Sequence, residues 1–171
     1  MTISLIVAIS NNGVIGCKKG GIPWHLPRDS SHFRSYTAGK WLLLGRTTFQ
    51  EMEGWFTDQT PLVLTSKTDL KVPQGYRVKS VEEAINLARQ NTAPELVICG
   101  GAEVYRQALP FVKKMILTRV DTNIENGICF PTVEDEEWEV NVEETFPADQ
   151  KNEFQMSFQI LTRKETRSIT A

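Results

Sequence analysis

Three short polar segments of this sequence each follow directly on an apolar run: Gly45-Arg46-Thr47-Thr48, Thr65-Ser66-Lys67 and Gly100-Gly101. The first places a guanidinium and two hydroxyls at the expected start of a helix. The glycine pair lets the backbone approach a ligand closely, because neither residue carries a Cβ. Backbone N–H groups, hydroxyls and cations are the donors that phosphate oxygens accept, so these segments predict a site for a phosphorylated ligand.

Each segment on its own also has a simpler interpretation. A Gly-Gly pair after a strand is usually a tight turn. The G-x-G-x-x-G dinucleotide fingerprint is absent, because Ala102 and Glu103 follow the pair. The coincidence of three such strand ends is the observation that favours phosphate binding.

Asp29 is the ionisable group best placed for chemistry. It lies at the end of a glycine-rich segment that we expect to be a mobile loop, and Pro27 predicts the first turn of the helix that follows. Asp29 then either satisfies the dipole of this helix at the surface or projects into a pocket. In the second case Trp24, Leu26 and Phe33 would surround the carboxylate with apolar surface and raise its pKa.

Other candidate ligands and nucleophiles carry less weight. His25 and His32 lack a third ligand at metal spacing, and His32 is expected on the surface of a helix. The three cysteines, Cys17, Cys99 and Cys129, form no C-x-x-C pair, which argues against both a disulfide framework and a thiolate zinc site. Cys99 is expected to be a small core residue. We therefore expect no metal and a reducing compartment.

The bulk properties indicate one compact domain with a small-molecule partner. The chain has 171 residues, 40% of them hydrophobic, so we expect a single domain over residues 1–165 and a flexible tail at 166–171. A formal charge of -2 gives no basic field for nucleic acid and favours a small-molecule partner. The run Ile3 to Ile9 is too short to span a bilayer and lacks the basic flank of a signal peptide. We expect a cytoplasmic monomer.

Apolar runs alternate with helical patterns along the chain. The runs are Ile3 to Ile9, Trp41 to Leu44, Leu62 to Leu64, Leu96 to Cys99 and Met115 to Leu117. Because several of them precede a helical pattern, the alternation predicts an α/β fold with a largely parallel sheet.

Two further patterns complete the expected elements. A helix is expected to begin after Ser80, where Glu83 completes a capping box, and to cover the sheet. The stretch from Trp138 to Leu161 alternates in polarity, with Trp138, Val140 and Val142 on one side of a strand. This stretch predicts a closing antiparallel hairpin.

In their order, these motifs resemble those of the dihydrofolate reductase family. The resemblance rests on Trp24-His25-Leu26-Pro27-Arg28-Asp29, Leu44-Gly45-Arg46-Thr47-Thr48-Phe49, Leu64-Thr65-Ser66 and Cys99-Gly100-Gly101-Ala102-Glu103-Val104-Tyr105, and continues through Leu117-Thr118-Arg119-Val120-Asp121 to Phe158-Gln159-Ile160-Leu161. It implies an eight-stranded, mostly parallel sheet flanked by four helices, a C-terminal antiparallel hairpin, and NADPH lying across the strand ends.

The resemblance also implies roles position by position. Asp29 would hold the 2-amino group and N3 of a pterin ring, Thr118 would assist through its hydroxyl, and Trp24 would complete the catalytic set. The implied substrate-binding residues are Ala8, Asp29, Phe33, Arg34, Met52, Gln59, Cys99 and Thr118. Gly100-Gly101 would form a cis peptide. The implied NADPH-binding residues are Ala8, Ile15, Gly16, Gly45, Arg46, Thr47, Thr48, Leu64, Thr65, Ser66, Lys67, Cys99, Gly100, Gly101, Ala102, Glu103, Val104 and Tyr105.

The implied reaction is the reduction of 7,8-dihydrofolate by NADPH. Hydride transfer to pterin C6 needs the two rings near contact distance, and N5 must gain a proton because a cationic N5 makes C6 electrophilic. Asp29 would raise the basicity of N5 without touching it, while the segment from Gly13 to Pro23 closes over both ligands and limits the access of water.

One position departs from the family pattern. Gln59 stands where the family usually carries an arginine that binds the α-carboxylate of the folate glutamate. A neutral amide cannot supply the charge-assisted bidentate pair that arginine gives a carboxylate. No Arg or Lys occurs between Arg46 and Lys67, so the substitute cation would be Arg34.

Three functions remain open at this point. The chain is a dihydrofolate reductase with a modified tail site, a reductase of another dihydropterin such as dihydromethanopterin, or a non-catalytic nucleotide-binding regulator. A riboflavin-pathway reductase fits less well, because the Asp29 motif suits a pterin. Asp29, Trp24 and Thr118 together argue against the regulator, since a pure binding module has no need for all three.

Overall fold

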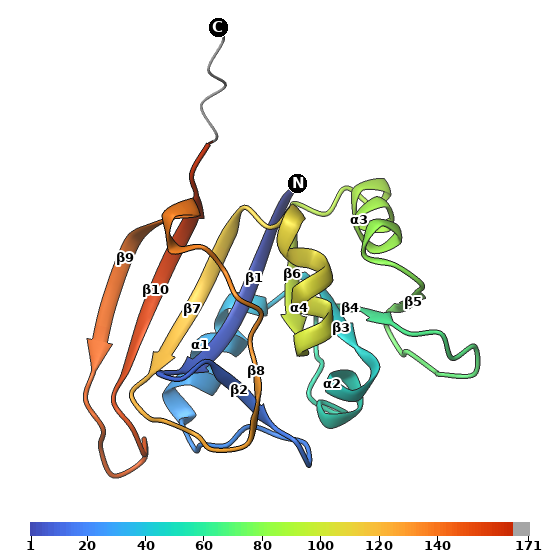
Figure 1. The fold of residues 1–171 in the computed structure, drawn as a ribbon. Coiled ribbons are helices and arrows are strands. Elements are labelled where there is room, and N and C mark those ends of the chain that lie inside the picture. The colour runs from blue at the N-terminus through green and yellow to red at the C-terminus, as the bar shows by residue number, and fades with distance from the viewer. Residues whose placement is uncertain (166–171) are drawn as a thin grey trace, which may run out of the picture.

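The computed structural model describes residues 1–165, which form one large sheet, a small second sheet and helices on both faces (Figure 1). The predicted tail at 166–171 lies outside the described residues. The strands are β1 (Thr2–Ser10), β2 (Val14–Cys17), β3 (Trp41–Gly45), β4 (Thr60–Leu64), β5 (Tyr76–Val78), β6 (Glu95–Gly100), β7 (Lys114–Val120), β8 (Gly127–Cys129), β9 (Trp138–Phe146) and β10 (Met156–Arg163). The helices are α1 (Pro27–Thr37), α2 (Arg46–Glu51), α3 (Val81–Gln90) and α4 (Ala102–Ala108), with 3-10 turns η1 (Leu109–Phe111) and η2 (Asp135–Glu137).

The large sheet has eight strands in the order β5-β4-β3-β6-β1-β7-β10-β9. Neighbouring strands from β5 to β7 all pair in parallel, whereas β10 runs antiparallel to both β7 and β9. The expected α/β class and the closing hairpin are therefore confirmed. Because β4, β3, β6 and β1 are parallel neighbours, their carboxyl ends meet at one edge of the sheet, where ligands of such sheets collect.

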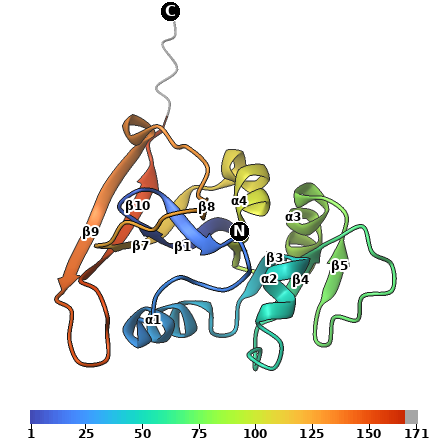
Figure 2. The same ribbon diagram turned by 60° about the horizontal axis from the view of Figure 1, so that its bottom comes forward.

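Different helices cover the two faces of the sheet, as Figure 2 shows for α1 on one side and α3 and α4 on the other. Phe33 of α1 and Phe49 of α2 pack on one face, while Ala84 of α3 and Val104 of α4 pack on the other. Residues 42–44 of β3 are fully buried without alternation, as expected for a parallel strand covered on both sides. Within the described chain, no helix is long and apolar enough to cross a membrane.

Helix α3 begins as the sequence predicts. The Ser80 hydroxyl accepts a hydrogen bond from the Glu83 N–H at 3.1 Å, so Ser80 caps the helix. The Glu83 carboxylate reaches back to the N–H of Lys79, one residue before the cap, at 2.7 Å. The capping box therefore satisfies two backbone donors and fixes the turn that leads from β5 into α3.

The predicted arrangement of the β9 side chains is wrong in one respect. A bulge changes the register so that Leu161 pairs with Val140 and the preceding Ile160 pairs with Val142. Because adjacent residues of β10 face opposite sides, Val140 and Val142 do so too, and both are exposed. Only Trp138 of the predicted apolar stripe is buried.

A charged cluster closes the end of the sheet opposite the ligand edge. Glu95, at the start of β6, pairs with Lys40 at 2.8 Å and with Lys114 at 3.3 Å, and it accepts a hydrogen bond from the Tyr36 hydroxyl. Burial of Glu95 opposes its charge, yet the hydrogen bonds from Lys40 and Tyr36 outweigh this effect and lower its pKa from 4.5 to about 2. The cluster therefore joins α1, the residue before β3, β6 and β7 electrostatically.

We predict that Glu95→Gln lowers the free energy of unfolding at neutral pH by about 2 kcal/mol, because it removes the charged acceptor of this cluster. Since the folded-state pKa is depressed, the stabilisation is present above pH 4.5 and is lost as the pH falls toward about 2. Denaturant unfolding from pH 7 to pH 3 measures both effects. The control is Glu125→Gln, which alters an exposed carboxylate; equal stability of the two variants across this range contradicts the prediction.

Candidate active site

A cavity of about 680 Å³ opens at the carboxyl ends of β1, β6 and β3. Its walls come from α1, α2, the start of α4 and the glycine-rich segment after β1. Twelve of the predicted site residues line it: Ala8, Ile15, Gly16, Trp24, Asp29, Phe33, Thr47, Thr48, Met52, Cys99, Gly101 and Tyr105. The fold thus brings together, in one cavity, residues that lie up to 97 positions apart in the sequence, from Ala8 to Tyr105.

Asp29 projects into this cavity from the first turn of α1. Desolvation raises the pKa of its carboxyl group, and a hydrogen bond from Thr118 together with the charge of His32 acts in the opposite direction. Thr118 is itself buried, on β7 behind the cavity wall. Of the two interpretations of Asp29, the geometry therefore supports the pocket carboxylate.

Two of the three apolar neighbours predicted for Asp29 lie where expected. Trp24 and Phe33 line the cavity beside the carboxylate. Leu26 is buried in a cluster with Val120 and Met156, against which Trp24 packs, and it does not itself line the cavity.

The ends of β3 and β6 pack closely because glycines occupy them. A Cβ on Gly45 would lie 3.3 Å from Val104 Cγ2, and a Cβ on Gly101 would lie 3.4 Å from Thr48 Oγ1. The two turns therefore present bare backbone beside the hydroxyls of Thr47 and Thr48. This cradle fits a diphosphate, which needs closely approaching N–H and O–H donors.

The Gly100-Gly101 peptide is cis, as the resemblance implied. Gly100 has φ +105°, and a Cβ there would lie 3.1 Å from the ring of Tyr105. The Tyr105 hydroxyl donates to the Ile6 carbonyl at 2.7 Å, and burial raises the pKa of this phenol well above its usual value. Tyr105 is thus a rigid wall of the cavity and not a proton donor at neutral pH.

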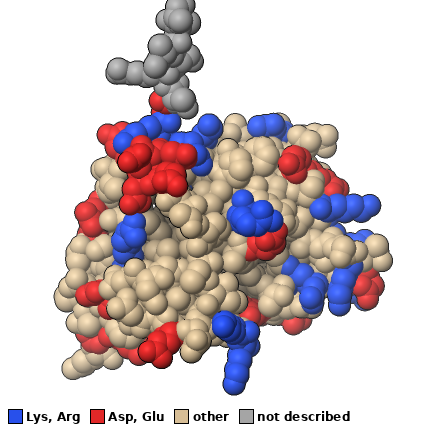
Figure 3. All heavy atoms as spheres, viewed as in Figure 1, with Lys and Arg blue, Asp and Glu red and all other residues tan. Residues whose placement is uncertain are grey.

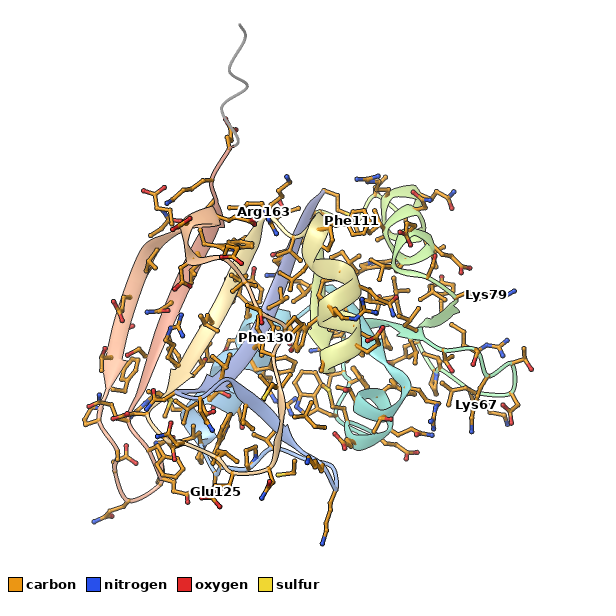
Figure 4. All side chains as sticks on the ribbon, in the orientation of Figure 1. Lys67, Lys79, Phe111, Glu125, Phe130 and Arg163 are labelled. Atoms are coloured by element: carbon orange, nitrogen blue, oxygen red, sulfur yellow. The ribbon has the colours of Figure 1, made fainter. Side chains whose placement is uncertain are left out.

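The third predicted phosphate segment lies at the same edge but outside the cavity. Leu64 pairs with Gly45, so Thr65-Ser66-Lys67 continues the rim formed by β3 and β6. The Lys67 N–H donates to Thr65 Oγ1 at 3.1 Å, and the side chains of Ser66 and Lys67 are exposed. Figure 4 labels Lys67 beside the loop between β4 and β5, and Figure 3 shows several Lys and Arg side chains on that side of the molecule.

Other predicted residues of the cofactor set support this rim without lining the cavity. Arg46 is half-buried at the start of α2, and its guanidinium donates to Gln50 at 3.1 Å. Val104 is buried under Gly45, whereas Ala102 and Glu103 form the first turn of α4. The thiol of Cys99 reaches the cavity, and burial raises its pKa, as expected of a core residue and not of a nucleophile.

The segment 13–23, here called the lid, is more regular than the predicted mobile loop. Val14–Cys17 form β2, which pairs antiparallel with β8. Gly127 of β8 permits this pairing, because a Cβ there would lie only 2.2 Å from Val14 Cγ1. Phe130, labelled in Figure 4, follows β8 and packs against Tyr105 with ring centroids 5.2 Å apart. The base of the lid is therefore an ordered part of the cavity wall.

The tip of the lid is held from the opposite wall. Gly20 and Gly21 have φ of +100° and +78°, which form a tight turn that other residues rarely adopt. The Gly21 N–H donates to Glu51 Oε1 of α2 at 3.1 Å, and the backbone N–H of Cys17 donates to the Gly21 carbonyl at 2.9 Å. Glu51 thus connects the lid to α2 across the cavity.

Sequence reasoning did not identify every cavity residue. Those missed outside the lid are Ile6, Val7, Ser30, Glu51, Trp55 and Ile128. Glu51 follows Thr47 by four residues on α2, so helical spacing from a predicted residue was a usable signal. Ile128 carries no such signal, because it reaches the cavity only through the pairing of β8 with β2.

The two residues predicted for the substrate tail lie outside the cavity lining. Gln59 is buried, and its side-chain oxygen accepts the Thr57 N–H at 2.9 Å, so the prediction that it faces a ligand is not supported by its orientation. Arg34 is exposed, and its guanidinium lies 4.6 Å from the ring centroid of Trp55. Since Trp55 lines the cavity, this stacking places a cation at the rim.

The prediction that His32 is a surface residue is wrong. Its ring is half-buried and stacks on Phe158 of β10, with centroids 4.1 Å apart and the planes 11° apart. The helix places it three residues after Asp29, toward the sheet. Among residues 1–165, no group of three or more His, Cys, Asp or Glu side chains is arranged to hold a metal ion.

Comparisons with known proteins agree on one family. A family model described as dihydrofolate reductase matches residues 2–163. The dihydrofolate reductase of Haemophilus influenzae is 39% identical over 165 residues, covering 96% of this chain and 100% of that protein. The dihydrofolate reductase type 3 of Salmonella typhimurium is 34% identical, covering 96% and 99%. A solved dihydrofolate reductase from Enterococcus faecalis, complexed with NADP(H) and RAB-propyl, has a TM-score of 0.84 at 30% identity, covering 96% and 97%.

We predict that Glu51→Ala loosens the lid. The substitution removes the acceptor of the Gly21 N–H, a hydrogen bond worth about 1 kcal/mol, so amide exchange of residues 17–22 should become roughly fivefold faster. Hydrogen exchange with mass spectrometry measures this. Glu53→Ala, which removes an exposed carboxylate two residues further on, serves as the control. Unchanged exchange in Glu51→Ala would show that the tip is held by other contacts.

Proposed function

The chain belongs to the dihydrofolate reductase family, and we propose that Asp29 is the ionisable side chain on which its reaction depends. The reaction is the NADPH-dependent reduction of 7,8-dihydrofolate to 5,6,7,8-tetrahydrofolate. The family resemblance of the motifs is thereby confirmed, as is the expected cofactor. The observation that carries the proposal is the desolvated Asp29 carboxylate, which lies in the same cavity as the diphosphate cradle.

The residues at the strand ends fit NADPH. Arg46, Thr47 and Thr48 would hold its diphosphate with the backbone of Gly101, and Ser66 with Lys67 would bind its 2′-phosphate at the rim. Ala8, Ile15 and Tyr105 would border the nicotinamide. When bound, NADPH supplies the hydride that pterin C6 accepts.

Asp29 orients the pterin and keeps negative charge beside it. Its carboxylate would accept the N–H groups of the 2-amino group and N3, with the Thr118 hydroxyl holding the carboxylate in place. The indole N–H of Trp24 is buried and makes no hydrogen bond within the described chain, so it remains a donor for a ligand in the cavity. This arrangement raises the basicity of N5 without direct contact.

With both ligands bound, the lid would limit the access of water to this carboxylate. Its base is fixed by the β2–β8 ladder and its tip by Glu51, and Ile15, Gly16 and Ile22 cover the cavity between them. With bulk water removed, the charge of Asp29 acts on the pterin through a medium of low dielectric. We expect protonation of N5 to proceed through the limited solvent that the closed lid admits.

Arg34 is our candidate for binding the acidic tail of the substrate. Gln59 is neutral and turned toward Thr57, whereas Arg34 lies at the rim with its guanidinium stacked on Trp55. Stacking on an aromatic face pre-organises guanidinium while its edge stays free for a carboxylate. This supports a dihydrofolate site with its tail-binding cation on α1 and not beside β4.

The proposal extends to the domain organisation, oligomeric state and cellular location of the chain. We propose that residues 1–165 form one domain, in keeping with the single large sheet that extends from β1 to β10. We further propose that the chain acts as a monomer in the cytoplasm, binding only small molecules. The walls of the cavity come from several elements of this one chain, which supports the proposal of a monomer.

We predict that Asp29→Asn reduces kcat/KM for dihydrofolate about 10²–10⁴-fold at neutral pH, because the amide cannot carry the negative charge that supports N5 protonation. The variant should melt at or above the temperature of the native chain at neutral pH. The raised pKa means that burying the charged form costs stability above that pKa, and asparagine removes this cost. Near-normal turnover by a folded variant would overturn the role of Asp29.

We predict that Arg34→Ala raises KM for dihydrofolate roughly three- to tenfold with little change in kcat, since an exposed charge pair contributes about 1 kcal/mol. A dihydropterin without the glutamate tail should show no such change. Arg89→Ala, on the distant α3, is the control. An equal effect of Arg34→Ala on both substrates would assign Arg34 to the shape of the site and not to the tail.

A further inference from the structure

His32 is the buried titratable group that the proposed reaction leaves unused. It lies on α1 three residues after Asp29, so the two side chains are neighbours on one helix face. Its Nε2 atom is inaccessible to solvent and has no hydrogen-bond partner within the described chain. The burial of its Nε2 atom distinguishes His32 from a histidine on the solvent-exposed face of a helix.

The sheet beneath α1 fixes the position of both side chains. Ala8 of β1 pairs with Thr118 of β7, which pairs with Phe158 of β10. Residues paired across strands share a face, so these three side chains form a row under α1. Asp29 contacts Thr118 in this row and His32 stacks on Phe158, the next position along it.

Few other charges face His32. The titratable and charged groups on the surrounding elements include Arg28, Asp29 and Tyr36 on α1, Lys114 on β7, Glu144 on β9 and Asp149 in the turn before β10. Arg34 of α1 instead stacks on Trp55, and Arg119 and Glu143 pair with Ser157 and Gln159, on the face of the sheet opposite Phe158. Arg28 pairs with Asp149 at 3.3 Å and lies over Phe146, and Lys114 and Tyr36 belong to the Glu95 cluster. Asp29 is the charge that acts on His32.

We propose that His32 is a positioning residue for Asp29, an imidazole clamped on Phe158 whose protonation holds the neighbouring carboxylate in its charged form. This inference rests on the proposed role of Asp29. In the neutral state the imidazole only packs. Once protonated, it places a positive charge one helical turn from the carboxylate and preserves the pterin anchor in mildly acidic conditions.

The electrostatics agree with this geometry. Burial lowers the pKa of His32 and the charge of Asp29 opposes that shift, whereas burial raises the pKa of Asp29 and the charge of His32 opposes it. The two groups therefore approach each other in pKa and titrate as a coupled pair. Because the coupling is reciprocal, removing either charge must change the titration of the other.

The first test is an NMR titration of the imidazole Cε1–Hε1 signals. The chain has 2 histidines, so the exposed His25 is an internal reference and His25→Gln assigns the signals. In Asp29→Asn we expect the pKa of His32 to fall below its value in the native chain. Identical titration of His32 in both proteins would overturn the proposal. This readout does not need turnover, so it is independent of failure of the proposed function.

The second test is the pH profile of kcat/KM for dihydrofolate in His32→Phe. This variant keeps a flat ring against Phe158 but cannot be protonated. We expect wild-type kcat/KM at neutral pH and an acid limb displaced to higher pH, with a loss of roughly three- to tenfold at about pH 5. His25→Gln should retain the native profile. An acid limb unchanged in His32→Phe would reduce His32 to a packing residue and overturn the proposal.

Discussion

A single carboxylate, kept from water at the first turn of α1, is the constraint on which the site depends. Charge in a desolvated position is costly unless neighbouring donors offset it, and Thr118 on β7 supplies one such donor. The C-terminal hairpin supports the same position from the other side. Asn152, buried in the turn before β10, accepts the Arg28 N–H at 3.0 Å, and Glu153 accepts the His25 N–H at 3.1 Å. The last two strands thus position a residue near the start of the chain.

At the cofactor end of the cavity, the approach of the backbone depends on the space that glycines leave. Gly45 and Gly101 bring the ends of β3 and β6 so close that a methyl group at Gly45 would press on Val104 and one at Gly101 would touch Thr48. This close packing leaves backbone donors accessible where a diphosphate would need them. The hydrogen bond from the Tyr105 hydroxyl to the Ile6 carbonyl fixes the neighbouring Tyr105 ring. The two ends of the cavity therefore depend on different features. Glycines allow close approach to the backbone at the cofactor end, and the desolvated Asp29 carboxylate supplies charge at the pterin end.

Local sequence predicted what depends on local chemistry. The α/β class, the three strand ends, the Ser80 cap and the helix start at Pro27 follow from short-range patterns, and all are present. The errors arise where distant segments meet. The bulge that separates Val140 from Val142, the pairing that makes part of the lid a strand, and the stack of His32 on Phe158 each need a partner that lies 18 to 126 positions away in the sequence, from Val142 with Ile160 to His32 with Phe158. Periodicity in one segment carries no information about such partners.

On the proposal that Arg34 binds the tail carboxylate, the neutral Gln59 changes how binding energy is distributed along the substrate. A buried arginine would hold the tail carboxylate in a medium of low dielectric, whereas Arg34 is exposed and its attraction is screened by water and salt. The tail then contributes less, and more of the affinity must come from the pterin end, where Asp29 and the apolar walls of Trp24 and Phe33 act out of water. A site arranged in this way depends more strongly on the ionisation of Asp29 than one anchored at both ends. Groups that control that ionisation, the Thr118 hydroxyl and the His32 ring, consequently gain influence over substrate binding as a whole.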